Sequence, residues 1–550
     1  MLEAGARFED HDFAKNSFDL KRFLFFPKLG MLGIQRIDFL KNVMVMSGAG
    51  VGGGSLVYAN TLYRPPTEFF QTGSWAQIAD WQRILSPYYD IAERMLGVQV
   101  NPFFSPADLV LKKIAKDRGV EDTFRMAPLG IYFADEGKEG KEVRDPYFDG
   151  KGPRRTGCIN CGECMTGCRH GAKNTLVKNY LYLAENPGAE QAGPEKAGAE
   201  VWDLTTVSHI KKHTDGGFEL TLKRTSIAGK VRPKTIRVPQ VIVAAGALGS
   251  AKLLQKSRDR GGLDGISEKL GELSRTNSES LLGVVARKKD LDFTKGAAIT
   301  SSVFPNAHTH IEPVRYGKGS GFMGLLESVM ASGPNGEAPN FGRLMKATFK
   351  NLLRLPNFYN LRTWPERTLI LLVMQSRDNS LTTYLKRSKV FSKKLTSKQG
   401  YGEVNPSWVP EGHAFAQEIA NEINGTPGAV IGEPFGIPMT AHFLGGAVIG
   451  ADEKAGVVDP YLRVFGVHGL HIWDGSTLSA NPGVNPSLSI TAQAEWAAAH
   501  WPNKGEADAR TPLGFKFGFV RPTAAKFPVL TRAPRVHGSR YQDPNNKPRQ

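Results

Sequence analysis

The chain has 550 residues, more than one hydrophobic core usually organises, so two domains are expected. Hydrophobic residues make up 41% and charged residues 22%, which is an ordinary globular composition. Lys and Arg outnumber Asp and Glu by 70 to 53, and a net charge of +17 favours anionic partners such as nucleic acid or a lipid surface. No groove of alternating basic and aromatic residues is visible, so a nucleic-acid partner is not expected.

The first residues predict the end of a buried strand. The segment Leu2-Glu3-Ala4-Gly5 places an acid where the second strand of a dinucleotide-binding unit holds a ribose. On this interpretation the first strand, glycine loop and helix, about 30 residues, lie upstream of Met1. The alternative is that Glu3 is a surface acid at a frayed terminus. Residues 1–10 carry acids and no apolar run of the signal-peptide kind.

A glycine cluster follows a strand-like segment at 43–46. Residues 48–53 match the pattern G-x-G-x-x-G, but prolines follow and no acid arrives about 20 residues later, so the cluster fails as a Rossmann fingerprint. Residues 42–63 are uncharged and long enough to span a bilayer. Their glycines, asparagines and serines argue instead for a buried loop.

Later segments predict the main helices and strands. Helices are expected around 81–96, at 247–258 and at 487–501, and a buried strand at 238–246. Residues 456–474 resemble a hairpin-like pair of strands, and 275–440 alternate short apolar runs with turns, as a sheet-based domain does.

Four cysteines form a compact run. Cys158, Cys161, Cys164 and Cys168 have the spacing of bacterial ferredoxins, except that Arg169 stands where proline usually follows. Four thiolates could also hold zinc, although this spacing suits zinc less well than two separated pairs. Disulfides are not expected in so short a segment. An iron–sulfur cluster and a metal-free structural role both stay open.

Several ordered motifs resemble the glucose–methanol–choline (GMC) oxidoreductase family, and within it the sterol-oxidising enzymes of actinobacteria. They are GAGVGGGSLVYAN (48–60), VIVAAGALGSAKLL (241–254), AHFLGGAVIG (441–450), VVDPYLRVFGVHGLHIWDGSTL (457–478) and NPGVNPSLSITAQAEWAA (481–498). The resemblance implies an α/β fold, in which a Rossmann-like FAD-binding domain lacking its first βα unit is joined to a sheet-based substrate domain.

The resemblance also implies where each domain lies. The FAD-binding domain is expected at 1–65, 166–275 and 440–505. The substrate-binding domain is expected at 66–165 and 276–439, and it contains the Cys-rich segment 158–168. A basic, Pro-rich tail in solvent would then occupy 506–550.

By the same resemblance, His442 is the catalytic base and Asn485 orients the substrate hydroxyl. Histidine suits this task because its ordinary pKa of about 6.5 lets it accept a proton near neutral pH. Phe443 departs from the family, which commonly has proline there. The residues expected to bind FAD are Glu3, Gly52, Gly53, Gly54, Ser55, Asn60, Ala245, Gly246, Asp474, Gly475 and Pro486. For Asn60 there is a discrepancy, since the family often has its asparagine where Tyr58 stands.

The implied reaction is oxidation of a sterol-type secondary alcohol, a 3β-hydroxysteroid such as cholesterol, to the ketone, with O2 reduced to hydrogen peroxide. The alternative is a dehydrogenase of another bulky alcohol that passes electrons to a different acceptor, through an iron–sulfur cluster if the cysteines hold one. A ferredoxin-like or basic binding protein without catalysis is the third alternative, against which the pair His442 and Asn485 argues.

Two further expectations follow from the resemblance. Steroid oxidases that also isomerise the double bond share a pocket glutamate, and the motif comparison places Gly319 there, with Glu312 and Glu327 nearby. The unrearranged ketone is therefore expected. The protein is expected in the cytoplasm, with transient contact to membrane surfaces, and secretion stays open because an upstream segment could carry a signal.

Overall fold

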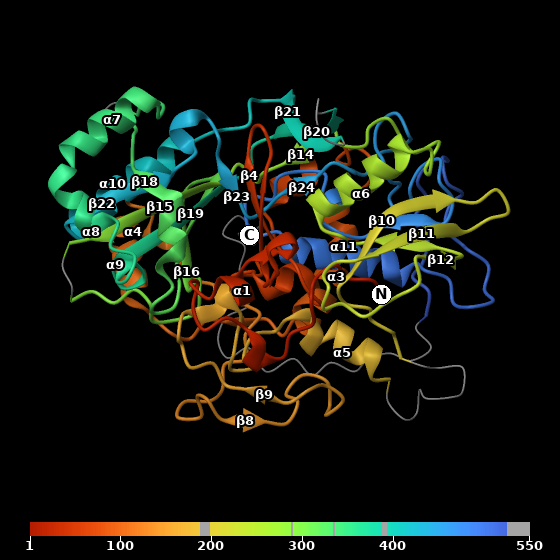
Figure 1. Ribbon diagram of the computed structural model, residues 1–550, viewed down its shortest axis with the longest axis horizontal. Helices are drawn as coiled ribbons and strands as arrows, with labels where there is room; N and C mark the ends of the chain where they lie inside the picture. Colours follow the sequence, from red (N-terminus) through yellow and green to blue (C-terminus); the bar gives the residue numbers. More distant parts are fainter. Residues whose placement is uncertain (188–197, 288–289, 334–335, 388–392, 525–550) are drawn as a thin grey trace, which may run out of the picture.

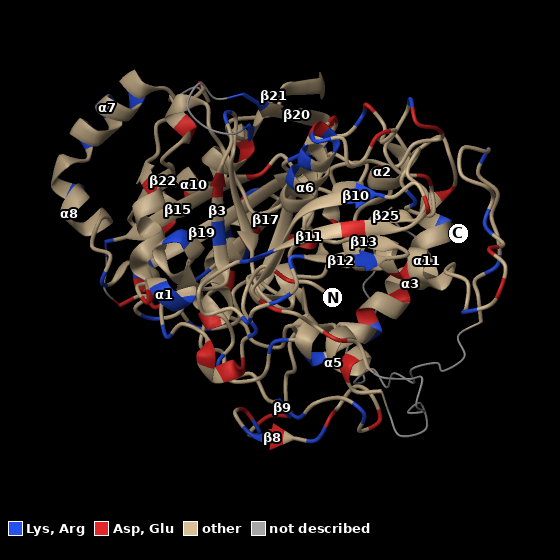
Figure 2. Ribbon diagram, turned by 45° about the vertical axis from the view of Figure 1, so that its right-hand side comes forward, with Lys and Arg blue, Asp and Glu red and all other residues tan. Residues whose placement is uncertain are grey.

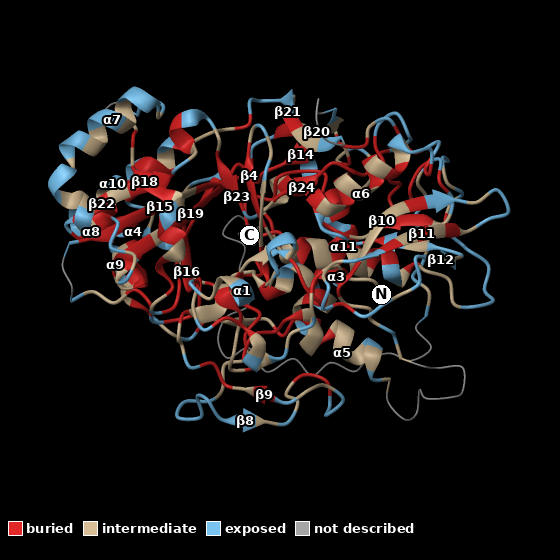
Figure 3. Cartoon of the chain, viewed as in Figure 1, coloured by how far each residue is buried: buried red, intermediate tan, exposed pale blue. Residues whose placement is uncertain are grey.

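The computed structural model describes residues 1–187, 198–287, 290–333, 336–387 and 393–524. Figure 1 shows two bodies side by side along the long axis. One is built on a large antiparallel sheet, and the other on helices α3, α6 and α11 with smaller sheets. Smaller sheets also connect the two bodies, and the buried residues in Figure 3 are concentrated inside each body.

The large sheet has seven strands, and every pairing in it is antiparallel. Leu369, Leu371 and Val373 of β19 pack under helices α4 (Pro106–Asp117) and α10 (Pro410–Glu422), because side chains alternate between the faces of a strand. Between them, Ile370 and Leu372 face the opposite side and line a cavity. The strands in spatial order are β18 (Glu327–Val329), β22 (Gly425–Val430), β15 (Ser280–Ala286), β19 (Thr368–Gln375), β17 (Thr309–Val314), β16 (Ser301–Asn306) and β6 (Arg125–Met126).

The second body confirms the three predicted helices as α3 (Trp81–Met95), α6 (Ala247–Asp259) and α11 (Ser487–Ala499). Helices α3 and α11 pack together, and Tyr89 Oη donates a hydrogen bond to Ser489 Oγ at 2.7 Å. The strands of this body are β10 (Thr205–Lys212), β11 (Phe218–Arg224), β12 (Thr235–Val238), β13 (Val241–Val243) and β25 (Leu470–Ile472).

Strand β13 is less buried than the sequence predicts. Among the described residues it pairs only with β25, in parallel, and the side chain of Ile242 is 43% exposed. Leu2 forms a parallel bridge with Trp202. The predicted hairpin at 456–474 is also irregular: β25 is its only strand among the described residues, and the rest consists of isolated bridges such as Val458 to Val464.

Two small sheets place chain segments from the middle of the molecule beside the glycine cluster. Strand β4 pairs in parallel with β23, which brings residues 48–54 and 441–445 to the same region. The strands of these sheets are β3 (Gln35–Phe39), β4 (Met44–Gly48), β23 (Met439–Thr440), β14 (Ser274–Arg275), β20 (Asn379–Lys386), β21 (Lys394–Gly402) and β24 (Leu444–Gly445).

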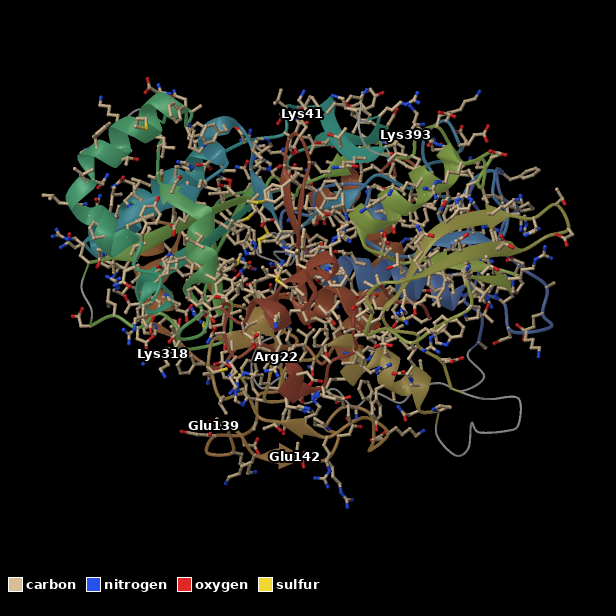
Figure 4. All side chains as sticks on the ribbon, viewed as in Figure 1. Arg22, Lys41, Glu139, Glu142, Lys318 and Lys393 are labelled. Atoms are coloured by element: carbon tan, nitrogen blue, oxygen red, sulfur yellow. The ribbon has the colours of Figure 1, made fainter. Side chains whose placement is uncertain are left out.

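Short elements complete the surface. The hairpin of β8 and β9 projects from the lower edge of the molecule, where Glu139 and Glu142 are labelled in Figure 4. None of the described helices is long and apolar enough to cross a membrane. The short elements are α1 (Leu20–Phe23), β1 (Phe25–Phe26), β2 (Met31–Leu32), η3 (Gly53–Leu56), α2 (Thr67–Gln71), β5 (Gln99–Val100), β7 (Pro128–Leu129), β8 (Glu142–Val143), β9 (Arg155–Thr156), α5 (Tyr180–Glu185), η7 (Gly321–Leu326), α7 (Phe341–Lys350), η8 (Leu352–Arg354), α8 (Leu355–Phe358), α9 (Trp364–Arg367), η9 (Glu433–Phe435) and η10 (Gly475–Thr477).

The predicted solvated tail needs one correction. Within 506–524, the ring of Phe517 stacks on Trp81 at 6.1 Å, and Tyr461 Oη donates to Gly518 O at 2.7 Å. Aromatic burial against α3 and α11 fixes this segment, which composition alone does not reveal. The rest of the predicted tail, 525–550, lies outside the described residues.

Candidate active site

A cavity of about 1580 Å³ is lined by residues from both bodies. It brings together twelve of the thirteen residues predicted for catalysis and FAD binding, which come from distant parts of the chain. They are Glu3, Gly52, Gly53, Gly54, Ser55, Ala245, Gly246, His442, Asp474, Gly475, Asn485 and Pro486. The exception is Asn60.

The glycine cluster exposes its backbone to this cavity. Gly52 and Gly53 have φ of 111° and 55°, in the left-handed region that favours glycine. A Cβ atom on Gly53 or Gly54 would meet no atom within 4 Å, so these peptides border open space. The hydroxyl of Ser55 fixes the turn, because it donates to Gly52 O at 2.6 Å and accepts from Leu176 N at 2.9 Å. The loop therefore presents backbone to an anionic or polar ligand.

Glu3 is not a frayed surface acid. Its Oε1 accepts hydrogen bonds from Gly5 N at 2.7 Å and Gly50 N at 3.2 Å. The two backbones approach so closely that a Cβ on Gly5 would lie 2.2 Å from Gly50 N. Burial raises the pKa of the Glu3 carboxyl. Residues 2–5 form an isolated bridge and not the predicted strand, but the Glu3 carboxyl joins them to the glycine cluster and borders the cavity.

Two helices begin at the cavity wall. Gly246, with φ of 72°, precedes α6, and Pro486 precedes α11. Asp474 lies between them: its carboxylate accepts from Ser250 Oγ and from Ser476 N at 2.9 Å. Burial raises the pKa of Asp474. Its position is therefore set by α6 and η10 together.

The imidazole of His442 lies beside a glutamate, Glu279, that the sequence did not predict. Nδ1 of His442 is 3.0 Å from Glu279 Oε2, at ion-pair distance but without hydrogen-bond geometry. The Glu279 carboxylate accepts from Ala441 N at 3.1 Å and Thr440 Oγ1 at 2.9 Å, so it is fixed in turn. No described residue makes a hydrogen bond to Nε2. This arrangement orients the ring and leaves one nitrogen available to accept a proton.

Asn485 contacts a second buried carboxyl group. Its Nδ2 donates to Glu312 Oε2 at 3.0 Å, and its Oδ1 has no partner among the described residues. Burial raises the pKa of Glu312 to about 8, and the nearby Glu279 adds to this. Glu312 is therefore mostly protonated at neutral pH, and Asn485 is held with a free carbonyl oxygen.

A third glutamate borders the cavity directly. Glu327 Oε2 accepts from Trp364 Nε1 at 3.0 Å, whereas Oε1 has no partner among the described residues. Burial raises the pKa of Glu327 to about 7. Gly319, where the comparison of motifs expects the pocket glutamate, does not line the cavity. Glu312 and Glu327 could be found in the sequence as acids close to Gly319, whereas no motif pointed to Glu279.

Asn60 lies on the other side of the cavity wall. It is fully buried, with φ of 69°, beside the thiol of Cys164. Tyr58, two positions earlier, lines the cavity instead. Asn60 therefore departs from the predicted set of cavity residues, in keeping with the discrepancy in the motif.

The cysteine segment packs behind the glycine cluster. The buried Lys173 joins the two, because its Nζ donates to Leu56 O and Tyr58 O, both at 2.8 Å, and to Cys164 O at 3.0 Å. Burial lowers the pKa of Lys173 to about 8, and the cysteines oppose this. Burial also raises the pKa of the Cys161 thiol to about 12.

All four cysteines are free of disulfides. A tetrahedral zinc site with bonds of about 2.3 Å would need sulfur atoms about 3.8 Å apart. Among the described residues, the one group whose ligand atoms all lie within 4.8 Å of one another is Cys161, Glu163 and His170. The four thiols do not form such a group in this structure.

Comparisons with known proteins agree with this geometry. The family model for GMC oxidoreductases matches residues 377–494. A cholesterol oxidase of Mycobacterium tuberculosis (strain CDC 1551 / Oshkosh) is 52% identical over 96% of this chain and 91% of its own length. A cholesterol oxidase of Acinetobacter baumannii is 42% identical over 92% of this chain and 90% of its own length.

The fold also matches solved structures. Pyridoxine 4-oxidase from Mesorbium loti superposes with a TM-score of 0.53 at 13% identity, covering 90% of this chain and 92% of its own. An FAD-dependent oxidoreductase from Chaetomium thermophilum gives a TM-score of 0.50 at 15% identity, covering 90% and 93%. This likeness confirms the α/β fold class. Taken with the two cholesterol oxidases and the cavity, it establishes that this chain belongs to the GMC oxidoreductase family.

Proposed function

We propose that this protein oxidises the 3β-hydroxyl group of a sterol such as cholesterol to the ketone, with FAD as hydride acceptor and O2 as final oxidant. One observation carries the proposal: His442 and Asn485 border the same large cavity. His442 lies beside the Glu279 carboxylate, and Asn485 donates a hydrogen bond to Glu312. The cholesterol oxidases similar to the chain support the substrate class.

The residues present fit FAD. Peptides at Gly53 and Gly54 border open space, as phosphate or flavin oxygens require, and Gly246 likewise leaves room beside its backbone. Helix α11 begins at Ser487, directly after Asn485 and Pro486, so its positive end can stabilise an anionic ring. Bound FAD would supply the hydride acceptor that no side chain can provide.

The protein's own residues handle the proton and the alcohol oxygen. We assign to His442 Nε2 the acceptance of the hydroxyl proton, which the carboxylate of Glu279 at Nδ1 makes more favourable. Glu312 fixes Asn485 through its Nδ2, so that the Asn485 side chain is held at the wall of the same cavity, with Oδ1 unpaired among the described residues.

The cavity suits a bulky apolar substrate. Its wall on the side of the large sheet consists mainly of apolar side chains. They include Leu281, Met323, Leu326, Trp364, Ile370, Leu372 and Val430. A fused-ring sterol would bury its hydrocarbon surface against these side chains, which gives a favourable transfer term of about 25 cal/mol per Å².

A second candidate is a dehydrogenase that passes electrons through an iron–sulfur cluster in the cysteine segment. The contact that favours it is Lys173, which joins that segment to the glycine cluster at the cavity. The spacing of the four cysteines matches a ferredoxin run. If the protein is such a dehydrogenase, the reduced protein should react slowly with O2 and quickly with an artificial electron acceptor.

Anaerobic mixing of flavin-loaded protein with cholesterol tests the proposal. Loss of the yellow flavin absorbance, followed by its return when air is admitted, is the expected result. A spectrum that stays oxidised would contradict sterol oxidation. The flavin could also be reduced by cholesterol but reoxidised slowly by air and quickly by an artificial acceptor. This result would favour the dehydrogenase.

We also propose that the protein is located in the cytoplasm. We further propose that it contacts membranes transiently, because sterols reside in bilayers. Cell fractionation that finds the protein only in the culture medium would contradict the location.

A further inference from the structure

An apolar helix face stands open at one end of the molecule. Figure 1 places α7 and α8 at the outer edge of the body with the large sheet, and Figure 3 shows no buried residue on α7. The exposed apolar residues here form what we call the α7 face. They are Phe341 (57% exposed), Met345 (40%), Phe349 (69%), Leu352 (57%) and Leu353 (97%).

The segment is anchored on its other side. Ala347 and Leu355 pack against the hydrophobic cluster that contains Met323 and Phe358. Asn340 caps the helix, since its side chain accepts from Arg343 N at 2.9 Å. The α7 face is therefore held outward by a folded helix, and it does not result from a loose segment.

The charge of the segment has one sign. Residues 338–365 contain Arg343, Lys346, Lys350, Arg354 and Arg362 and no acid. Arg343 pairs with Glu337 at 2.9 Å, whereas Lys346, Lys350 and Arg354 form no ion pair with a described residue. Figure 2 shows Lys and Arg along α7. Apolar residues flanked by unpaired cations are typical of helices that lie at the surface of an anionic bilayer.

The α7 face extends onto a neighbouring element. Phe341 lies against Phe435 of η9, with ring centroids 5.9 Å apart, and Phe435 is 58% exposed. In the same body, Leu325 on η7 is 49% exposed, and its chain neighbours Met323 and Leu326 line the cavity.

We infer that the α7 face docks on the surface of a bilayer that contains anionic phospholipid. The unpaired cations beside exposed apolar side chains favour anionic lipid over a protein partner. Delivery of a sterol from the bilayer rests on the proposed function, whereas the docking itself does not.

Sedimentation with vesicles tests the docking. The protein is mixed with vesicles of phosphatidylcholine alone or with about one third phosphatidylglycerol, at low and high salt. We expect binding only to the anionic vesicles, weakened by salt because counterions screen the attraction. The variant Lys346→Glu/Lys350→Glu should bind more than tenfold more weakly, since each basic residue contributes roughly fivefold. Phe349→Ser/Leu353→Ser should also lose binding.

Matched controls come from the loop between β11 and β12, at the opposite end of the molecule in Figure 1. There Ile227 and Val231 are 91% and 84% exposed and lie near Lys230 and Lys234. Ile227→Ser/Val231→Ser and Lys230→Glu/Lys234→Glu should bind vesicles as the parent protein does. Equal loss in controls and α7 variants would show a nonspecific charge effect and overturn the inference.

Two further measurements separate the remaining outcomes. Sedimentation velocity without lipid measures whether the protein is a dimer and whether Phe349→Ser/Leu353→Ser dissociates it. A dimer that this variant dissociates, in a protein that binds no vesicles, would assign the α7 face to a second copy and overturn the inference. If the protein oxidises sterols, the same variant should lose the rate on vesicle-embedded sterol and keep the rate on detergent-dissolved sterol. Vesicle binding without sterol oxidation would refute the proposed function alone.

Discussion

His442 is the residue whose replacement should affect turnover most specifically. Its ring accepts the proton in our proposal, and general-base catalysis typically contributes about 10²–10⁴-fold. We expect His442→Ala to lower kcat by that order while bound flavin stays near the parent content, because the glycine cluster is untouched. Steady-state rates and flavin absorbance measure both. Near-normal turnover in flavin-loaded protein would refute the assignment, and Asn485→Ala should behave in the same way.

Glu279 acts through His442, and so its replacement should lower turnover without weakening substrate binding. Glu279→Gln keeps the shape of the side chain but removes the negative charge 3.0 Å from Nδ1. The positive charge that His442 acquires when it takes the hydroxyl proton is then less stabilised, and we expect a lower kcat with KM little changed. Steady-state kinetics measure both constants. A variant in which kcat is unchanged and only KM rises would contradict this role.

Glu312 revises the expectation about the product. The motif comparison places glycine where isomerising oxidases have a glutamate, but the structure brings Glu312 to Asn485. With its pKa raised to about 8, this group ionises in a growing fraction as pH rises from 6 to 9. We therefore expect a 5-ene-3β-ol sterol to give an increasing share of conjugated 4-en-3-one across this range, measured by ultraviolet absorbance. Glu312→Gln should give only the unrearranged ketone. If neither pH nor the Glu312→Gln substitution changes the share of conjugated product, Glu312 is not the base that isomerises the double bond.

The same group makes stability depend on pH. The folded state holds the Glu312 proton up to about pH 8, whereas the unfolded chain releases it near its ordinary value of 4.5. Stability therefore falls as pH rises between these values, by at most about 1.4 kcal/mol per pH unit. Glu312→Gln removes this term, so its Tm relative to the parent should rise from pH 5 to pH 8. A constant difference would contradict the raised pKa.

At the scale of elements, the cysteine segment and the glycine cluster are joined by Lys173. If the segment holds an iron–sulfur cluster, aerobically purified protein should contain iron and acid-labile sulfide, and Cys161→Ser should lose both. Anaerobic reconstitution without iron uptake would leave the metal-free structural role. Cys161→Ser should then keep parent flavin content, because Lys173 contacts the backbone of Cys164 and not the Cys161 thiol.

At the scale of the whole molecule, local sequence predicted the elements that have strong local signals. Helices α3, α6 and α11 follow from local sequence patterns. The convergence of Glu3, the glycine cluster, His442 and Asn485 was implied by the resemblance of the ordered motifs to the GMC family. Glu279 and Lys173 could not be predicted, because their contacts join segments more than 100 residues apart. The burial of Phe517 on Trp81 and the exposure of the α7 face likewise depend on tertiary packing, which no single segment encodes.

The central claim is that the cavity oxidises a sterol alcohol and reduces O2, and product stoichiometry tests it most directly. Flavin-loaded protein is incubated with cholesterol in air, and ketone and hydrogen peroxide are measured together, with His442→Ala as control. We predict one peroxide for each ketone in the parent protein and a loss of both, by at least about 100-fold, in the control. Flavin-loaded protein that forms no ketone from cholesterol, or forms as much with His442→Ala as without it, would contradict the account.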